Sequence, residues 1–398
     1  MLPDLRPPAP RGDAPRSVAV LGSTGSIGVQ TLEVAALFPD RLRITALAAG
    51  TRWQELAEQA RRVRPDHVVI ADEAHLGALR DALAGTGVEV AAGTDAVREL
   101  AEEAEVDVVV AAIVGAAGLR PTLAAVEAGK TVALANKESL VVAGALVEAA
   151  AARSGAVVVP VDSEHSALFQ CLVGEPAGSV ERLILTASGG PFRLRPAETF
   201  DAISPEEAVA HPNWSMGAKI SVDSATMMNK GLEVIEARWL FGVHADQIEV
   251  VVHPQSVVHS VVEFVDGSSK AQVGPPDMRV PIQVALAFPD RWAAPHPRLD
   301  WTRTGPLTFE PVDADRFPCL GLAYDALRAG GSAPAALNAA NEVAVARFLT
   351  GDVRFTDVPR LVEVGLATAR PAGTLDGLLA VDAAARRAAA DARALTTA

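Results

Sequence analysis

Short apolar runs alternate with longer amphipathic stretches from Ser17 to about Pro160. The runs are rich in Val, Ala and Ile, and the stretches between them carry apolar residues at the spacing of an α-helix. Repeated strand and helix units of this kind predict an α/β fold with a doubly wound, Rossmann-like parallel sheet. The strands are expected at 17–21, 43–49, 67–71, 107–113, 131–135 and 156–161.

The pattern changes after Asp162, where loops separate a helix expected at 225–241 from strands expected at 248–252 and 256–264. This mixture predicts a central α+β domain, and the proline-rich stretch after it predicts a linker. Ala-rich stretches near the end predict a C-terminal helical domain, with helices at 320–328, 333–349, 358–369 and 381–395. The predicted parts are a disordered tail 1–15, a first domain 16–161, a central domain 162–288, a linker 289–312 and a helical domain 313–398.

Composition narrows the class of protein. A chain of 398 residues suits two or three domains, and no apolar run reaches the roughly 20 residues of a membrane span. The first 16 residues hold five prolines and no apolar stretch. A secretory signal is therefore not expected, and the protein is expected in the cytoplasm. Two cysteines argue against a disulfide framework, and a net charge of -14 argues against nucleic acid as a partner.

A glycine-rich turn follows the first expected strand. The segment Gly22-Ser23-Thr24-Gly25-Ser26-Ile27-Gly28 leads from that strand into an amphipathic helix expected at 29–38. Glycines let the backbone approach a pyrophosphate, and the helix N-terminus offers free N–H groups to it. The turn therefore favours a dinucleotide site, and the alternative is a plain tight turn between strand and helix.

The end of the second strand bears on cofactor choice. An NAD-selective site places an acid there, whereas this chain has Gly50-Thr51-Arg52. The missing carboxylate and the arginine favour NADP. Arg52 has an equally simple explanation as a solvated residue at a helix start.

Three carboxylates are the candidate metal ligands. Asp162 and Glu164 follow an apolar strand and, in an extended segment, point to the same side of the chain. Glu233 is expected on a helix that also carries Asn229 and Lys230 on the same face. Ligands that are all oxygen favour Mg²⁺ or Mn²⁺. Taken singly, each carboxylate is more simply explained as a surface acid or a helix ion pair, so the metal site depends on the residues around them.

Further polar residues surround these carboxylates in the sequence. Ser224, Asn229 and Lys230 supply hydroxyl, amide and ammonium donors suited to a phosphate. The segment His211-Pro212-Asn213-Trp214-Ser215-Met216-Gly217 has the composition of a loop that closes over a substrate, or of a static loop with a packed Trp214. Asn136-Lys137-Glu138 follows an expected strand at the ligand edge of the sheet, although a lone lysine there is often simply solvated.

With these residues in view, the sequence resembles the 1-deoxy-D-xylulose 5-phosphate reductoisomerase family of the non-mevalonate isoprenoid pathway, from about Arg16 to the C-terminus. Many long motifs in the same order carry the resemblance. They are 22–28, 135–139, 160–165, 188–192, 211–217, 221–236, 253–256 and 276–279. The extra tail before Arg16 and the Gly50-Thr51-Arg52 sequence, where related enzymes commonly end in asparagine, depart from the family pattern.

The resemblance implies a role for each site residue. The divalent metal, Mn²⁺ or Mg²⁺, is implied to bind Asp162, Glu164 and Glu233. Substrate contacts are implied for Lys137, Ser163, Glu164, Ser188, His211, Ser224, Asn229, Lys230 and Glu233, with Lys137, Glu164 and His211 as the catalytic residues. NADPH contacts are implied for Thr24, Gly25, Ser26, Ile27, Gly50, Asn136, Glu138 and Gly217. Arg52 is added to these contacts because it follows the second strand, where no acid stands.

The same resemblance implies the reaction. A phosphorylated ketose, 1-deoxy-D-xylulose 5-phosphate, is isomerised to a branched aldehyde and reduced by NADPH to 2-C-methyl-D-erythritol 4-phosphate. The implied enzyme is a homodimer. Competing functions are an ordinary NADP-linked sugar or polyol dehydrogenase, a semialdehyde or glyceraldehyde phosphate dehydrogenase with a nucleophilic cysteine, and a non-catalytic NADP sensor.

Overall fold

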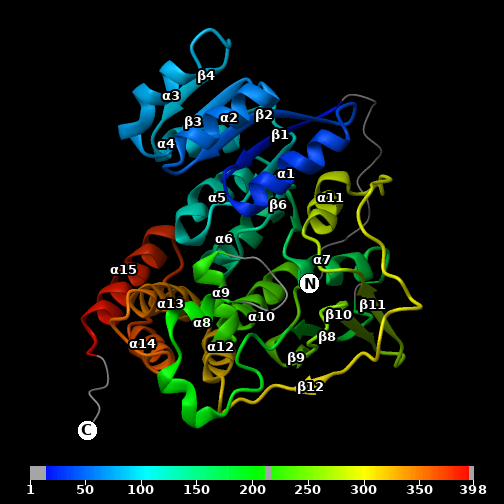
Figure 1. Cartoon of the computed structure of the whole chain (residues 1–398), viewed down its shortest axis with the longest axis vertical. Helices are drawn as coiled ribbons and strands as arrows, with labels where there is room; N and C mark the ends of the chain where they lie inside the picture. The colour runs from blue at the N-terminus through cyan, green and yellow to red at the C-terminus, as the bar shows by residue number, and fades with distance from the viewer. Residues whose placement is uncertain (1–14, 177, 211–216, 394–398) are drawn as a thin grey trace.

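The computed structural model describes residues 15–176, 178–210 and 217–393. Its first sheet has seven parallel strands in the order β4-β3-β2-β1-β5-β6-β7, so the strand order reverses at β1 (Figure 1). The doubly wound prediction is confirmed. The strands are β1 (Arg16–Leu21), β2 (Leu42–Ala49), β3 (His67–Ile70), β4 (Glu89–Ala92), β5 (Val108–Ala111), β6 (Thr131–Leu134) and β7 (Val157–Pro160).

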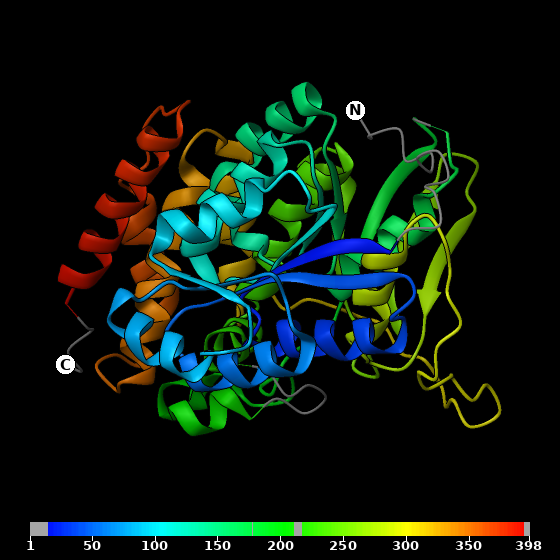
Figure 2. The same ribbon diagram turned by 90° about the horizontal axis from the view of Figure 1, so that it is seen from above.

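Helices cover both faces of this sheet, as Figure 2 shows. Strands buried on both faces need apolar side chains at every position, which explains the continuous Val and Ala runs of β1 and β5. The short edge strand β4 was not expected, because its residues alternate between exposed and half-buried and form no apolar run. The helices are α1 (Ser26–Leu37), α2 (Trp53–Val63), α3 (Leu76–Ala82), α4 (Thr94–Glu102), α5 (Leu119–Glu127) and α6 (Lys137–Ser154).

A second, mixed sheet confirms the central α+β prediction. Its order is β11-β10-β8-β9-β12, with β8 and β9 parallel and the other pairs antiparallel. Strands β8, β11 and β12 were not expected from the sequence, and β12 brings the end of the expected linker to the sheet edge. The strands are β8 (Val180–Ala187), β9 (Ile248–Val252), β10 (Val258–Phe264), β11 (Ser269–Val273) and β12 (Glu310–Pro311).

The helix expected at 225–241 is α10, which begins three residues later, and a separate helix, α9, precedes it. Met227 has a φ of 63°, a left-handed conformation that ends α9 and sets the new direction of α10. Helix α11 returns to the first sheet, where it packs on α1, and Arg16 donates at 2.8 Å to the carbonyl oxygens of Leu286 and Phe288. The helices of this region are α7 (Ser163–Leu172), α8 (Pro205–Val209), α9 (Ala218–Ala225), α10 (Met228–Phe241) and α11 (Arg279–Ala287).

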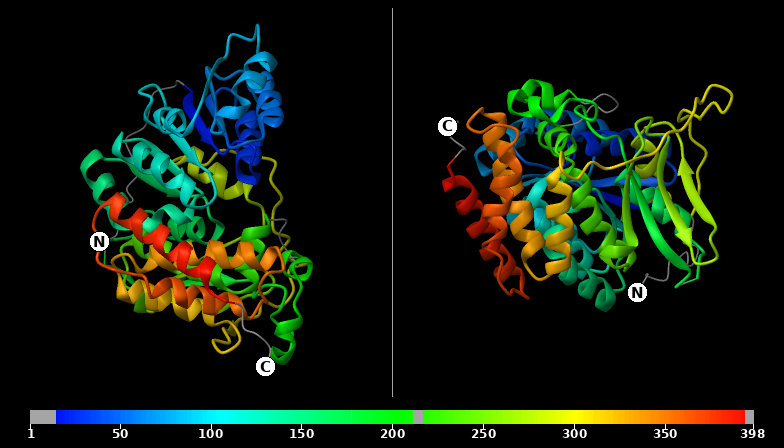
Figure 3. Two further views of the ribbon diagram at one scale, coloured as in Figure 1. Left: turned by 90° about the vertical axis from the view of Figure 1, so that its left-hand side faces the viewer. Right: turned by 90° about the horizontal axis from the view of Figure 1, so that it is seen from below.

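Four helices near the chain end confirm the predicted C-terminal helical region. They lie on the opposite side of α10 from the second sheet (Figures 1 and 3). Helix α13 is buried around most of its circumference, which its alanines permit because they let neighbouring helices approach closely. The helices are α12 (Pro318–Ala329), α13 (Ala333–Leu349), α14 (Asp357–Leu366) and α15 (Leu375–Asp391), and short 3-10 helices elsewhere cover Glu73–His75, Gly115–Gly118, Ala197–Ala202 and Ala245–Gln247. In the part of the chain that the structure describes, no helix is both long and apolar enough to cross a membrane.

A pair of glycine substitutions tests the close packing of α13 and α14. A Cβ at Gly365 would lie 2.2 Å from Ala340 Cβ, whereas a Cβ at the exposed Gly321 of α12 meets nothing within 4 Å. We expect Gly365→Ala to lower the free energy of unfolding by about 1–3 kcal/mol through overpacking. Gly321→Ala should raise it by about 0.5–1 kcal/mol, because alanine restricts the unfolded chain. Urea denaturation measures both, and equal stability of the two variants would contradict this packing.

Candidate active site

One cleft of about 960 Å³ collects most of the residues singled out in the sequence. Its walls come from the carboxyl ends of the first sheet and from α9, α10 and the start of α11, which join the first sheet to the central region. Ligands of open α/β sheets bind at this edge, near the point where the strand order reverses. The expected site residues in its lining are Gly25, Ser26, Ile27, Arg52, Lys137, Glu138, Asp162, Ser163, Glu164, Ser188, Gly217, Ser224, Asn229, Lys230 and Glu233.

The glycine turn after β1 has the geometry of a phosphate loop. Gly22 has a φ of 91°, and a Cβ there would lie 2.5 Å from the carbonyl oxygen of Ala112. A Cβ at Gly28 would lie 2.4 Å from Gly22 O, so α1 packs on the turn only because residue 28 is glycine. Gly25 occupies the N-cap of α1 without a side-chain cap bond, and Thr24 is buried just before it. The N–H groups at the start of α1 therefore face the cleft.

Arg52 and Gly50 stand at the end of β2. Arg52 is exposed at the N-cap of α2 and lines the cleft on the same side as Ser26. The guanidinium is therefore placed where it can meet a cofactor phosphate. A solvated residue at a helix start has the same exposure, so its role in choosing NADP stays a prediction.

Asn136 and Glu138 are fixed at the start of α6, directly after β6. Asn136 caps the helix through Oδ1, which accepts from Ser139 N at 3.1 Å. Its Nδ2 donates to Gly115 O at 3.0 Å and to Glu138 Oε2 at 3.1 Å. These bonds hold the Glu138 carboxylate against the cofactor side of the cleft.

The three expected metal ligands converge, although not in the way the sequence suggested. Asp162 and Glu164 do not lie in an extended segment: Asp162 is the N-cap of α7, and its Oδ1 accepts from Ser163 N at 3.1 Å. Glu233 reaches them from α10. Oxygen atoms of Asp162, Glu164 and Glu233 all lie within 4.8 Å of one another. Such a set of hard oxygen ligands can hold one divalent cation.

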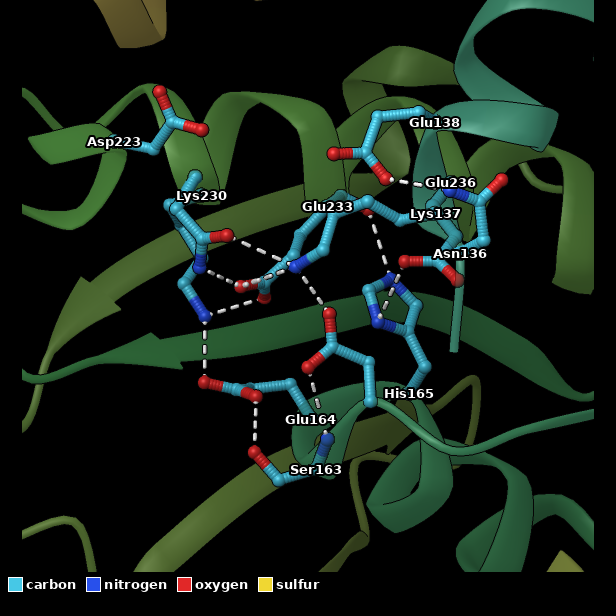
Figure 4. Close-up of polar contacts among 12 residues, drawn as sticks. Asn136, Lys137, Glu138, Ser163, Glu164, His165, Asp223, Lys230, Glu233 and Glu236 are labelled. Atoms are coloured by element: carbon cyan, nitrogen blue, oxygen red, sulfur yellow. Dashed lines mark hydrogen bonds and ion pairs between the residues drawn. The ribbon is translucent and has the colours of Figure 1, made fainter. Parts of the chain in front are cut away.

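Two lysines lie between these carboxylates (Figure 4). Lys137 pairs with Asp162, lies 3.7 Å from Glu233 Oε1, and donates to Asn229 Oδ1 at 2.9 Å. Lys230 donates to Glu164 Oε1 at 2.8 Å and to Glu233 Oε2 at 2.5 Å. Both ammonium groups therefore serve as counter-charges for the acidic cluster.

Burial and neighbouring charges shift the pKa values of these groups in opposite directions. Burial and the adjacent Glu164 raise the pKa of Glu233 to about 8, against the pull of both lysines. Burial opposes ionisation of Asp162 as well, but the ammonium of Lys137 outweighs it and holds the pKa of Asp162 at about 2. Against the same burial, Lys230 lowers the pKa of Glu164 and the carboxylates keep the pKa of Lys137 well above its usual value.

His165 and Glu236 were not singled out in the sequence. Both are fully buried behind the cluster, with His165 Nδ1 3.3 Å from Glu236 Oε2 and His165 Nε2 2.9 Å from the carbonyl oxygen of Glu233. With Asp162 they form a second group of potential ligand atoms, but one enclosed in the core. The spacing of three residues between Glu233 and Glu236 was a usable signal, because it places both on one helix face.

The residues expected to hold the substrate phosphate lie on two packed segments. Ser188 follows β8 at the turn Gly189-Gly190, and a Cβ at Gly190 would lie 2.8 Å from Ser224 O. This contact brings the Ser188 turn against the end of α9. Asn229 and Lys230 follow at the start of α10, and Asn229 Nδ2 donates to Glu233 Oε1 at 2.5 Å.

The loop expected at 211–217 and the alternative of a nucleophilic cysteine remain to be placed. His211 and Trp214 lie outside the described residues, and Gly217 after them is the N-cap of α9 and lines the cleft. The cysteine alternative loses its basis, because burial raises the pKa of both Cys171 and Cys319, that of Cys319 to about 12. A nucleophilic cysteine needs the opposite environment.

Comparison with known proteins finds matches over most of the chain. Family models of 1-deoxy-D-xylulose 5-phosphate reductoisomerase match residues 18–144, and models of its C-terminal domains match 158–241 and 273–388. The chain is 55% identical to that enzyme from Caulobacter vibrioides over 386 residues, covering 95% of this chain and 96% of the relative. The relative from Rhodospirillum centenum is 57% identical over 382 residues, covering 96% and 95%.

Solved structures of such enzymes share the fold. The enzyme from Zymomonas mobilis, in complex with NADPH, is 49% identical, with a TM-score of 0.89 over 94% of this chain and 98% of that one. A structure with NADPH, fosmidomycin and magnesium is 44% identical, with a TM-score of 0.90 over 94% and 97%. The chain therefore belongs to the 1-deoxy-D-xylulose 5-phosphate reductoisomerase family.

Proposed function

We propose that this member of the family works with a single cleft, in which Asp162, Glu164 and Glu233 hold one divalent cation and the α1 turn holds NADPH. The activity that family membership carries is the isomerisation and reduction of 1-deoxy-D-xylulose 5-phosphate. The observation that carries the proposed roles is the convergence of three carboxylates on the wall of the cleft that also contains the start of α1. The related structure with NADPH, fosmidomycin and magnesium supports the same combination of ligands.

The acidic cluster fits a divalent cation on its own chemistry. The cluster has three carboxylates and only two lysines, so one negative charge lacks a partner when all three are ionised. Burial and the adjacent Glu164 raise the pKa of Glu233 to about 8, and a bound cation would favour its ionised form. Mg²⁺ and Mn²⁺ prefer this kind of oxygen site. When bound, the cation polarises the carbonyl and neighbouring hydroxyl oxygens of the ketose together, and NADPH supplies the hydride. The enclosed set of His165 and Glu236 cannot serve the substrate in this way.

The cofactor side of the cleft fits a dinucleotide. The α1 N-terminus supplies backbone donors for a pyrophosphate. Gly22 and Gly28 let the turn and α1 pack directly on neighbouring backbone, which fixes the position of these donors. Gly25, Ser26 and Ile27 line this wall, and Thr24 is buried directly before them. Gly50 and Arg52 from β2, Asn136 and Glu138 from α6, and Gly217 from α9 complete the proposed NADPH contacts.

Lys137 and Glu164 have complementary proton roles. The raised pKa of Lys137 keeps it protonated, so it donates to substrate oxygens and does not act as a base. Glu164 stays ionised because its pKa is lowered, and its Oε2 accepts from Ser163 Oγ at 2.5 Å. We assign Glu164 as the group that assists removal of the substrate hydroxyl proton. His211 keeps its predicted catalytic role.

The substrate phosphate is proposed to bind Ser188, Ser224, Asn229 and Lys230. The contact of Gly190 with Ser224 supports this grouping, because it brings two of the donors onto adjoining segments. Binding energy at the phosphate, away from the reacting carbons, positions the carbon skeleton for rearrangement.

We further propose that the enzyme is a cytoplasmic homodimer. The two free, buried cysteines agree with a reducing compartment. Between α11 and α12, Trp301 and Phe309 are 69% and 51% exposed, which is unusual for large apolar side chains on one segment. We assign this segment to the contact with a second copy of the chain, because covering its two aromatic rings there would remove apolar surface from water.

Replacing one metal ligand tests the cation site. We expect Glu233→Gln to lower kcat/KM by at least about 100-fold, because an amide is a weaker ligand and the site loses a charge. A chelator should abolish wild-type NADPH oxidation, and added Mg²⁺ or Mn²⁺ should restore it. Glu148→Gln, on the exposed face of α6, is the control and should leave activity unchanged. Near-normal turnover by Glu233→Gln would sink the ligand assignment.

Lys230 provides a test of phosphate recognition. Removing the ammonium in Lys230→Met should raise KM for the phosphorylated ketose about 10–100-fold, as expected for a hydrogen bond between charged groups. With dephosphorylated 1-deoxy-D-xylulose, which has no phosphate for Lys230 to bind, the wild type and the variant should react equally slowly. A larger loss with the dephosphorylated sugar would show that Lys230 acts elsewhere.

Sedimentation velocity at micromolar concentration tests the homodimer. The wild type should sediment as a dimer, and Trp301→Asp combined with Phe309→Asp should shift it towards one chain, because charges would enter the apolar contact. Leu194→Asp is the matched control, since Leu194 is 80% exposed on a different segment. A wild type that sediments as a single chain contradicts the proposal.

A further inference from the structure

A second group of charged side chains lies beside the metal cluster. Lys219, in the first turn of α9, donates to Glu138 Oε1 at 2.8 Å and lies 3.1 Å from Asp223 Oδ2. The side chains of Glu138 and Asp223 are only 8% and 1% exposed, and that of Lys219 is 22% exposed. One ammonium therefore joins carboxylates from α6 and α9, which belong to different parts of the chain.

The group continues into the C-terminal helices. Asn341, fully buried on α13, donates through Nδ2 to Asp223 Oδ1 at 2.7 Å. Asp223 thus uses one oxygen for α13 and the other for Lys219. Helix α13 packs on both α9 and α6 and lies beside α9 in Figure 1. A continuous series of polar contacts, Asn341 to Asp223 to Lys219 to Glu138, crosses from the C-terminal helices to the cofactor wall.

The far end of this series lies in the cleft. Glu138, Lys219 and Asp223 all line it, together with Ser26 and Gly217. Glu138 is held by Lys219 through one oxygen and by Asn136 through the other. In Figure 4 the carboxylates of Glu138 and Asp223 lie beside the cluster that contains Lys230 and Glu233.

Electrostatics makes the position of Glu138 depend on Lys219. Burial would raise the pKa of Glu138, but Lys219 outweighs it and keeps the pKa below its ordinary value. Conversely, burial alone would lower the pKa of Lys219, but Asp223, Glu138 and, most weakly, Glu342 raise it above its ordinary value. A buried carboxylate without its cation protonates or leaves its position. Either change removes a fixed hydrogen-bond acceptor from the cofactor wall.

We propose that Lys219, Asp223 and Asn341 are positioning residues for the cofactor, and that α13 thereby sets the affinity for NADPH. They act through Glu138, whose carboxylate they hold in place. The inference rests on the proposed binding of NADPH in this cleft. It gives the C-terminal helices a role in the reaction although the cofactor turn lies more than 300 residues earlier in the sequence.

Two buried asparagines on α13 provide a matched test. Asn341 contacts Asp223, whereas Asn338, equally buried one turn earlier, donates to Glu342 Oε1 at 3.1 Å. We expect Asn341→Leu to raise the Kd for NADPH about tenfold, measured by cofactor fluorescence with the full-length protein well below its Tm. Asn338→Leu should lower Tm to a similar extent but change the Kd by less than about twofold. KM for the ketose phosphate should stay within about threefold in both.

Lys219 variants keep the test decisive if Asn341→Leu does not fold. Lys219→Met should raise the Kd for NADPH at least about tenfold, and Lys219→Arg, which keeps the charge, should recover most of the affinity. Wild-type affinity in folded Asn341→Leu or Lys219→Met overturns the inference. Equal loss in Asn341→Leu and Asn338→Leu overturns it too, because the effect would then be one of general stability. A wild type that does not bind NADPH instead contradicts the proposed cofactor site.

Discussion

Charge balance within one buried cluster constrains the structure around the cleft. Four carboxylates, those of Asp162, Glu164, Glu233 and Glu236, meet two ammonium groups, those of Lys137 and Lys230. If all were ionised, two negative charges would remain without a partner. Burial first, and then the neighbouring carboxylates, raise the pKa values of Glu233 and Glu236. One divalent cation carries the missing charge. The cluster is therefore suited to the cation by its total charge as well as by its ligand atoms.

Such a cluster persists only because rigid elements hold its members together. Asn136 and Asp162 cap α6 and α7 directly after β6 and β7, so neighbouring parallel strands deliver Lys137 and Glu164 to the same place. Helix α10 supplies Glu233 from a segment whose residues are nearly all buried. Because burying like charges is unfavourable, the packing of these helices must offset the electrostatic penalty. The geometry of the acidic cluster therefore depends on the packing of the helices that carry it.

The sequence predicted what local patterns determine and missed what depends on distant contacts. The Val-rich strands, the Gly22 to Gly28 turn and the C-terminal helices were predictable, because periodicity and glycine geometry are local properties. The extended conformation expected for Asp162 to Glu164 was wrong, because an acidic residue after a strand can equally cap a helix. The break between α9 and α10 at Met227 was not predictable, because no glycine or proline stands at that position. The bond of Lys219 to Glu138 joins residues 81 positions apart and has no local signal at all.

The return of α11 to the first sheet has a consequence for how the molecule can be divided. Ile282 and Leu286 are buried, the ring of Trp292 lies 5.0 Å from that of Phe38, and Arg16 binds the end of α11. The body that carries the cofactor turn is therefore discontinuous, with the central region inserted between two of its segments. A single cut after residue 161 would separate this body from the helix that covers α1. Fragment complementation or domain exchange in this enzyme needs a pair of junctions, one on each side of the insertion.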